Sequence, residues 1–346
     1  MKVLVAKEPG IAEYVELPKP TPEDDQVILK LYRNGVCGTD LEILDGSAFF
    51  MNNGSTQYPV RFGHEFSGVI TEVGKNVKNF KVGEHVVGDG AIFCGKCPEC
   101  LAGNWYSCQH LRSVGTIDAW PGSYAEYMVL PERNLFHLPE GLSHDNAALI
   151  EPAAIGMAGI DKCNIIPGES IVLITGVGAI GLACAAFAKW KGAKQVIVSG
   201  RTPYKLDIAK KLGADYVINP KEEDLVKVVK EITNGHGADC ILECSGSISV
   251  IDDCLEVLAQ RGIFAVIAFY GRKYETFDID TFVLRDAEIK AVTLHDFENT
   301  IKALEDGVDL SPLITRHVKF DEAADFLMQQ IKQKTSDIKV VINIAD

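Results

Sequence analysis

Several features that mark whole classes of protein are scarce or missing in this sequence of 346 residues. Ten cysteines are far fewer than a disulfide-stapled secreted domain carries, and no signal peptide precedes them. The formal net charge is −14 and no basic patch offsets it, which disfavours nucleic acid and membranes as partners. Glycines interrupt the longest apolar run, residues 171–188, so it predicts a strand, a turn and a helix instead of a membrane span. We therefore expect a cytoplasmic protein.

Internal repeats, low-complexity tracts and disordered linkers are also missing. Apolar residues make up 47% of the chain and charged residues 24%, and both values are near those of globular proteins. The length suggests two domains, each able to bury a core of its own.

Four cysteines cluster in one short stretch, FCGKCPECLAGNWYSC. Cys94, Cys97, Cys100 and Cys108 supply four thiolates, the ligand set of a closed tetrahedral Zn²⁺ site. Disulfides or free thiols are the competing interpretations, and the low cysteine density favours the metal. The stretch therefore predicts a structural zinc that stiffens a loop and performs no chemistry.

A second and more open set of metal-ligand residue types is spread along the first 151 residues. Cys37 stands in GVCGTD, His64 and Glu65 in FGHEFSG, and Glu151 in ALIEPAA. A catalytic zinc needs about three protein ligands and one open position, and a thiolate, an imidazole and a carboxylate can supply those three. A single buried Cys or His is more often part of a core. The joint pattern, and not the spacing, favours a catalytic zinc.

The pattern of apolar and turn-forming residues changes near residue 154. Before it, short β-branched stretches such as 66–73 and 124–130 are separated by Gly, Pro and Asn turns, which indicates a β-rich domain. After it, apolar strands such as 171–175 alternate with helical patterns such as 203–214. This alternation predicts an α/β fold with a doubly wound parallel sheet.

The segment TGVGAIG has the spacing GxGxxG in the context that a dinucleotide site requires. It follows an apolar strand and opens the helical segment 179–190. Gly176 would permit a tight turn, Gly178 the approach of a pyrophosphate, and Gly181 close packing of helix on strand. The helix N-terminus would add unpaired N–H groups and a favourable dipole. The predicted loop comprises Gly176, Val177, Gly178, Ala179, Ile180 and Gly181.

The end of the next strand lacks the acidic residue of NAD-specific sites. Such an Asp or Glu, about twenty residues after the glycines, binds the ribose hydroxyls. Here Gly200 stands at that point, between Ser199 and Arg201, and Lys205 offers a second positive charge. An arginine suits phosphate because its charge is planar and permanent. The pattern predicts a preference for NADP(H) over NAD(H), and a solvated loop arginine in an NAD enzyme is the alternative.

The motifs CGTD, GHEFSGVI, the four-cysteine lobe, GSYAEY, IEP and TGVGAIG occur in this order, at these separations, in zinc-dependent medium-chain dehydrogenases. The resemblance covers nearly the whole chain, and the Glu at the third-ligand position is similar to the sorbitol and threonine dehydrogenase branch. It implies a discontinuous GroES-like catalytic domain, residues 1–153 and 294–346, around a Rossmann domain, residues 154–293. It also implies one catalytic and one structural Zn²⁺ per chain and a homodimer or homotetramer.

The same resemblance assigns roles around the second zinc. Cys37, His64 and Glu151 would be its ligands, and Glu65 would be an interchangeable or water-linked fourth carboxylate. The Thr39 hydroxyl would contact the substrate oxygen and begin a proton relay to solvent.

Other residues near these motifs match the family less closely. Asp40 would orient His64, and a plain turn Asp is the alternative. Glu42 stands where many relatives carry a relay His. The string CGTDLEI is similar to archaeal glucose dehydrogenases, which suggests that Glu42 could accept hydrogen bonds from sugar hydroxyls. The alternative is an exposed charge. Leu294 and His295 stand where sorbitol dehydrogenases carry Tyr and a substrate-binding Arg, which argues against sorbitol itself.

The sequence thus predicts an enzyme that transfers a hydride between NADP(H) and a secondary alcohol or ketone of a polyol, sugar or cyclitol. Glu42, Asp45 and His295 could add polar groups that suit a small molecule with several hydroxyls. Alternatives within the family are an aldose dehydrogenase, a simple secondary alcohol dehydrogenase and a threonine-type dehydrogenase. A zinc-free reductase and a nucleotide-binding protein without catalysis are the alternatives outside it, and the intact zinc-ligand set argues against both.

Overall fold

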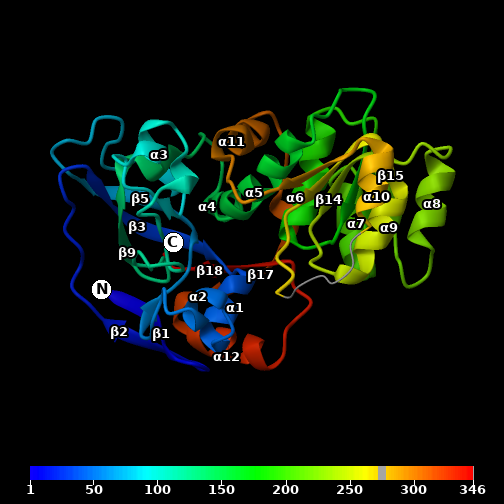
Figure 1. Ribbon diagram of the computed structural model, residues 1–346. Helices are drawn as coiled ribbons and strands as arrows, with labels where there is room; N and C mark the ends of the chain where they lie inside the picture. The colour runs from blue at the N-terminus through cyan, green and yellow to red at the C-terminus, as the bar shows by residue number, and fades with distance from the viewer. Residues whose placement is uncertain (272–277, 346) are drawn as a thin grey trace. The chain divides into compact units, whose positions relative to one another are not determined.

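The computed structural model describes residues 1–271 and 278–345 of the chain (Figure 1). It divides into two compact units. Unit 1 combines Met1–Glu151 with Ile314–Asp346, and unit 2 is Pro152–Leu313. The chain therefore leaves the first unit, builds the second, and returns to the first.

Unit 1 is rich in antiparallel β-structure. Its strands are β1 (Lys2–Glu8), β2 (Ile11–Glu16), β3 (Gln26–Gly35), β4 (Val60–Arg61), β5 (Glu65–Val73), β6 (His85–Gly88), β7 (Ala91–Ile92), β8 (Arg112–Ser113), β9 (Tyr127–Pro131), β10 (Leu135–His137), β17 (Ile314–Lys319) and β18 (Lys339–Asn343). The largest sheet has the order β10-β6-β5-β3-β18-β17, and β9 also pairs with β3. Two smaller sheets have the orders β2-β1-β4 and β7-β8. Alternate residues of β3, such as Leu29 and Leu31, pack with Phe66 of β5 in one buried cluster, as the period of two predicts.

The register of β3 with its neighbours brings distant residues together. Gly35, the last residue of β3, lies opposite Glu65, the first residue of β5. Gly35 also lies opposite Val341 in β18, which begins at Lys339. An amine from the C-terminal segment is thereby placed beside a carboxylate from the N-terminal segment.

Short helices follow the strands of unit 1: α1 (Gly38–Asp45), α2 (Phe49–Asn52), α3 (Pro98–Leu101), α4 (His144–Ala147) and α12 (Ala323–Lys332). The helix α1 begins directly after β3, because Cys37 is extended and its N–H donates to the Asp40 carboxylate over 3.0 Å. It ends at Gly46, whose φ of +83° is the left-handed conformation that glycine adopts most easily. Both ends of the helix that carries the CGTD motif are therefore fixed locally.

Unit 2 is a parallel sheet with helices between its strands. The strands are β11 (Ile171–Thr175), β12 (Gln195–Ser199), β13 (Tyr216–Ile218), β14 (Ala238–Glu243), β15 (Leu258–Val266) and β16 (Glu288–Ala291). The helices are α5 (Ile150–Lys162), α6 (Ala179–Trp190), α7 (Pro203–Lys211), α8 (Leu225–Ile232), α9 (Ile251–Val257), α10 (Ile279–Arg285) and α11 (Phe297–Glu305). All neighbours in the order β13-β12-β11-β14-β15-β16 run parallel. This is the doubly wound order, and it confirms the predicted α/β fold.

Helices cover both faces of this parallel sheet. Ile241 of β14 packs in one buried cluster with Val229 of α8 and Leu255 of α9. Its neighbour Leu242 points to the opposite face, where its side chain lies 3.2 Å from the position that a Cβ on Gly159 of α5 would occupy. Among the residues that the structure describes, no helix is long and apolar enough to cross a membrane.

The second compact unit extends to Leu313, and the chain returns to unit 1 at Ile314, whereas the sequence interpretation placed this boundary at residue 294. The helix α11 belongs to unit 2 because it is tied to two other helices there. Asn299 donates to Asp161 of α5 over 3.1 Å, and Trp190 of α6 donates to Asp306, just after α11, over 3.2 Å. An amphipathic helix has the same sequence pattern whichever unit it covers, so the pattern could not place the boundary.

Candidate metal centres and dinucleotide cavity

The four cysteines of the lobe converge on one point of unit 1, with all four sulfur atoms within 4.8 Å of one another. The Sγ–Sγ distance is 3.5 Å between Cys97 and Cys100, and 3.9 Å both between Cys94 and Cys100 and between Cys97 and Cys108. Four sulfurs at the usual bond length around one zinc would be about 3.8 Å apart. The spacing of the thiols therefore fits a tetrahedral zinc.

Backbone N–H groups donate hydrogen bonds to the sulfurs of the lobe and stabilise negative charge on them. The Cys97 N–H donates to Cys94 over 3.3 Å, and N–H donors from Cys100 and Gln109 lower the pKa of Cys97 to about 6. Burial has the opposite effect on Cys100 and raises its pKa to about 12. Because zinc binds thiolates, the lobe contains one sulfur that ionises readily and one that a cation would have to deprotonate.

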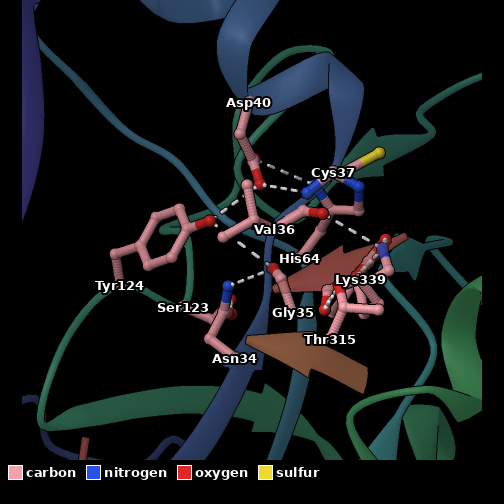
Figure 2. A network of polar contacts seen from close by, with 11 residues as sticks. Asn34, Gly35, Val36, Cys37, Asp40, His64, Ser123, Tyr124, Thr315 and Lys339 are labelled. Atoms are coloured by element: carbon pink, nitrogen blue, oxygen red, sulfur yellow. Dashed lines mark hydrogen bonds and ion pairs between the residues drawn. The ribbon is translucent and has the colours of Figure 1, made fainter. Parts of the chain in front are cut away.

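A second group of donor atoms lies at the junction of β3, α1 and β5 (Figure 2). Cys37 precedes α1, and His64 and Glu65 stand at the start of β5; one ligand atom from each lies within 4.8 Å of the other two. His64 and Glu65 are buried, and Cys37 is half-buried. A sulfur, a nitrogen and an oxygen donor thus meet where one side remains accessible, and this donor set suits a catalytic zinc.

A fully buried carboxylate organises this donor group. Asp40 accepts hydrogen bonds from the Cys37 N–H over 3.0 Å and from the Tyr124 hydroxyl over 2.9 Å, both at Oδ2 (Figure 2). Its Oδ1 lies 3.5 Å from Nδ1 of His64, and neither atom has a hydrogen-bond partner within the described residues. An N–H at Nδ1 that faces Asp40 would leave the Nε2 lone pair for a metal.

The charge around His64 favours a cation at this point. Burial lowers the pKa of His64, but the Asp40 carboxylate and the Cys37 thiolate raise it well above its ordinary value. A divalent cation bound to the ring would neutralise the charge of these two neighbours. The residues therefore fit a zinc ion by donor type and by charge.

Lys339 of β18 forms a buried ion pair with Glu65. Its Nζ lies 2.6 Å from both carboxylate oxygens and 3.1 Å from the Val36 carbonyl oxygen. Burial lowers the pKa of Lys339, but Glu65 and Cys37 raise it above its ordinary value, so the amine stays charged. A Cβ on Gly35 would stand 2.1 Å from Glu65 Oε2, so glycine is the residue that leaves room for this carboxylate.

Glu151, the third ligand that the family resemblance implies, lies in the first turn of α5 and is buried. It is not one of the three residues whose ligand atoms lie closest together, a set that contains Glu65 instead. Its charge nevertheless contributes to raising the pKa of Lys339. Two carboxylates therefore lie near the same amine, and the most compact donor set uses the one expected to be a secondary ligand.

The remaining predicted residues lie in different places. Thr39 is half-buried in the first turn of α1, whereas Glu42 and Asp45 are exposed on the same helix. His295 lies in unit 2 just before α11, with its ring edge-on to Phe297 at a centroid distance of 6.0 Å. The structure therefore places Thr39 on the helix that follows Cys37, and it leaves Glu42 exposed.

Unit 2 has a cavity of about 530 Å³ at the carboxyl ends of β11, β12 and β14. Gly176 has a φ of +101°, and a Cβ there would stand 2.8 Å from the Ser245 backbone nitrogen, so the turn requires glycine. Nothing lies within 4 Å of a Cβ on Gly178, so a ligand could approach its backbone closely. A Cβ on Gly181 would stand 2.1 Å from the Gly176 carbonyl oxygen, so the helix could not pack this closely with any larger residue.

The cavity contains most of the predicted cofactor residues. Its lining includes Gly176, Val177, Gly178, Ser199, Gly200, Arg201 and Lys205. Ala179, Ile180 and Gly181 are in α6 and are not part of the lining. The sequence interpretation missed Ser245 and Ser247 in the loop after β14 and Asp253 of α9, which also line the cavity. These residues were missed because the polar segment between a strand and the next helix has no fixed motif.

Comparison with known proteins decides the family. The description "Alcohol dehydrogenase GroES-like domain" matches residues 23–140, and "Zinc-binding dehydrogenase" matches residues 179–308. An L-threonine 3-dehydrogenase of Rhizobium etli is 32% identical over 330 residues, which cover 94% of each chain. A sorbitol dehydrogenase of Halalkalibacterium halodurans is 33% identical over 331 residues, 93% of this chain and 94% of the relative. This chain belongs to the zinc-dependent medium-chain dehydrogenases. The predicted dehydrogenase activity class is thereby confirmed.

Solved structures of other dehydrogenases agree with this one along its whole length. A zinc-binding dehydrogenase of Sinorhizobium meliloti, bound to NADP, superposes with a TM-score of 0.89 at 26% identity and covers 99% of both chains. Galactitol-1-phosphate dehydrogenase from Escherichia coli gives a TM-score of 0.90 at 25% identity, covering 99% of this chain and 100% of its own. The two-unit architecture of this dehydrogenase is therefore that of its family.

Two residues beside the candidate metal ligands of this dehydrogenase were not predicted as site residues. Lys339 is a single charged residue at the start of the apolar strand KVVIN, and such a position indicates a buried partner. Tyr124 was noted only as part of the string GSYAEY, although a fully buried tyrosine needs a partner for its hydroxyl. Both signals were present in the sequence, but neither identified the partner.

Proposed function

We propose that this dehydrogenase transfers a hydride between NADP(H) and a secondary alcohol or ketone of a polyhydroxylated small molecule. The observation that carries the proposal is the convergence of Cys37, His64 and Glu65 in unit 1. A thiolate, an imidazole and a carboxylate form an open donor set of the kind used by catalytic zinc. Unit 2 supplies a glycine-lined cavity for the dinucleotide.

Two zinc ions per chain would be held by different residues. The four cysteines of the lobe would hold the structural ion, while Cys37, His64 and one carboxylate, Glu65 or Glu151, would hold the catalytic one. A bound catalytic zinc supplies a Lewis acid that lowers the pKa of an alcohol, and a bound nicotinamide supplies the hydride acceptor.

The chain's own residues orient the donors and carry the proton. Asp40 would fix the tautomer and orientation of His64, and the Tyr124 hydroxyl would hold Asp40 in place. The Thr39 hydroxyl would take the proton that leaves the substrate alcohol. Lys339 would compensate part of the negative charge that the thiolate and carboxylates add.

The preference for NADP(H) rests on the residues at the end of β12. Gly200 offers no carboxylate to repel a 2′-phosphate, and Arg201 and Lys205 line the same cavity. A relative of known structure binds NADP, which agrees with this assignment. A charge-assisted hydrogen bond contributes about 1.5–3 kcal/mol, or roughly one to two decades of affinity.

The substrate class is proposed from the relatives and from the family branch. Their names refer to threonine, sorbitol and galactitol 1-phosphate, each a secondary alcohol with further polar groups. A threonine-type activity is the second candidate, because that relative covers 94% of the chain. An aldose or a simple secondary alcohol is the remaining choice. The reduced thiols that both zinc sites need favour a cytoplasmic location.

One panel of assays separates these possibilities. The holoenzyme is assayed with sorbitol, galactitol 1-phosphate, L-threonine, glucose and 2-butanol, each with NADP⁺ and with NAD⁺. The proposal expects the highest kcat/KM for a polyol with NADP⁺, because a site that binds hydroxyls rejects analogues without them. A value for 2-butanol equal to that of the polyols would refute the substrate class. Full activity after dialysis against a chelator would instead identify a zinc-free reductase.

Arg201→Ala tests the cofactor assignment. It should lower kcat/KM with NADP⁺ by about 10-fold to 100-fold and with NAD⁺ by less than about 3-fold. Arg261→Ala, an exposed arginine of the same unit outside the cavity lining, is the matched control. Equal losses with both cofactors would show that Arg201 does not contact the phosphate.

A further inference from the structure

A neighbouring side chain, and not the backbone conformation, restricts residue 200 to glycine. Gly200 is buried at the end of β12 and is not in the left-handed conformation that favours glycine. The backbone alone would therefore accept any residue there. A Cβ at this point would nevertheless stand 2.5 Å from both methyl groups of Val177. A neighbouring side chain, and not the strand geometry, excludes larger residues.

Rotation of Val177 does not relieve this contact. The Cβ at residue 200 would also be 3.1 Å from the Val177 Cβ, so it would sit between the two methyl groups. A valine fills two of the three staggered positions around its Cα–Cβ bond. Two of the three face Gly200 in this structure, so every rotamer keeps at least one methyl group there. An unbranched side chain could turn away, but valine cannot.

Backbone movement is restrained on both sides of the contact. The Gly176 N–H donates to the Ser199 carbonyl over 2.8 Å, and the Gly200 N–H donates to the Ile218 carbonyl over 3.0 Å. The turn that carries Val177 is fixed in addition by the positive φ of Gly176. Residue 200 and the valine are thereby held against each other, and a shift of either would break strand or turn hydrogen bonds.

We propose that Val177 is a specificity-determining residue of this dehydrogenase: it prevents residue 200 from carrying the acid that an NAD site uses. The inference rests on the proposed NADP(H) preference. An Asp or Glu that binds the ribose hydroxyls must start from a Cβ, and Val177 occupies the space of that atom. The position next to Arg201 therefore stays without negative charge, and a 2′-phosphate can bind there.

The first test measures the steric contact without reference to the cofactor. Gly200→Ala adds only the Cβ, and overpacking of this kind should lower the Tm by roughly 2–10 °C. In a Val177→Ala background both methyl groups are gone, and the same change should lower the Tm by less than about 2 °C. Val177→Ile keeps the branch at Cβ and is the matched control, so its background should leave the effect of Gly200→Ala undiminished.

The second test measures specificity. Gly200→Asp alone should weaken both dinucleotides at least about 10-fold, because the valine must move out of a packed site. The double variant Val177→Ala with Gly200→Asp should regain affinity for NADH. Its ratio of kcat/KM for NADH to kcat/KM for NADPH should be about 100-fold higher than in the wild type. Val177→Ala alone should change this ratio by less than about 3-fold. The ratio is the decisive readout, because a purely structural role of Val177 would alter both cofactors equally.

The outcomes separate this inference from the proposed function. If wild-type enzyme prefers NADH, the NADP(H) proposal is refuted, whatever the Tm series gives. If Gly200→Ala has the same effect in the Val177, Ala and Ile backgrounds, the steric inference is refuted. The steric inference is also refuted if the double variant Val177→Ala with Gly200→Asp does not fold or does not regain affinity for NADH.

Discussion

Replacement of Lys339 by methionine is expected to lower the free energy of unfolding by about 3–5 kcal/mol, because it leaves the Glu65 carboxylate buried without its cation. Methionine keeps most of the apolar stem, so little packing is lost. The side chains of Lys339 and Glu65 are only 5% and 1% exposed, and Nζ lies 2.6 Å from both carboxylate oxygens. Solvent therefore cannot replace the missing charge.

A second ion pair of the same unit provides the control. Lys19 and Glu72 are also 2.6 Å apart, but their side chains are 37% and 46% exposed. An exposed pair contributes about 0–1 kcal/mol, so Lys19→Met should have a small effect. The contact distance and the substitution are the same in both pairs, so the comparison tests the effect of burial.

The assay is urea unfolding of the holoenzyme, followed by circular dichroism. The double variant Lys339→Met with Glu65→Gln should regain part of the loss, because a neutral amide no longer needs a cation. The reasoning is refuted if Lys339→Met has no larger effect than Lys19→Met. It is also refuted if neutralising Glu65 makes the Lys339 variant less stable still.

Three further outcomes are expected. Metal analysis should find about two Zn²⁺ per chain, and full activity with one zinc or fewer would rule out two sites. Cys97→Ser should chiefly lower thermal stability, whereas Cys37→Ser should abolish turnover. Tyr124→Phe deletes the hydroxyl that donates to the carboxylate beside the metal ligands, so zinc affinity in a chelator competition should fall by about 10-fold, and unchanged affinity would speak against a positioning role. Burial holds the pKa of His144 at about 4, below its ordinary 6.5, so its stability contribution is complete above pH 6.5 and is lost as the pH falls toward 4. His144→Gln should therefore flatten the dependence of unfolding free energy on pH in this window, and an unchanged slope would contradict the assignment.

Features encoded by neighbouring residues could be predicted from the sequence. The helix α6 begins at Ala179, directly after the glycine turn, because both the motif and the apolar pattern are local. The four sulfurs of the lobe converge for the same reason, since fifteen residues can hardly place them elsewhere. The doubly wound parallel class of unit 2 follows from the local alternation of strands and helices.

Features that depend on long-range pairing could not be predicted. Glu65 and Lys339 are 274 positions apart, and only the register of β18 on β3 brings them together. Which of two carboxylates, Glu65 or Glu151, completes the closest donor set depends on distances of a few ångström that no motif encodes. The contact between Val177 and Gly200 is likewise a matter of how a turn packs against a strand end.

The return of the chain to unit 1 also has a consequence for its synthesis. During synthesis β18 emerges from the ribosome only after all of unit 2 has left the exit tunnel. Until then the main sheet of unit 1 lacks one of the strands that pair with β3, and Glu65 lacks the amine of Lys339. Unit 2 is a single continuous stretch and can fold while translation continues. The nascent chain can thus form the cavity of unit 2 before the surroundings of Cys37, His64 and Glu65 are complete, and a chain that ends before β18 has the first without the second.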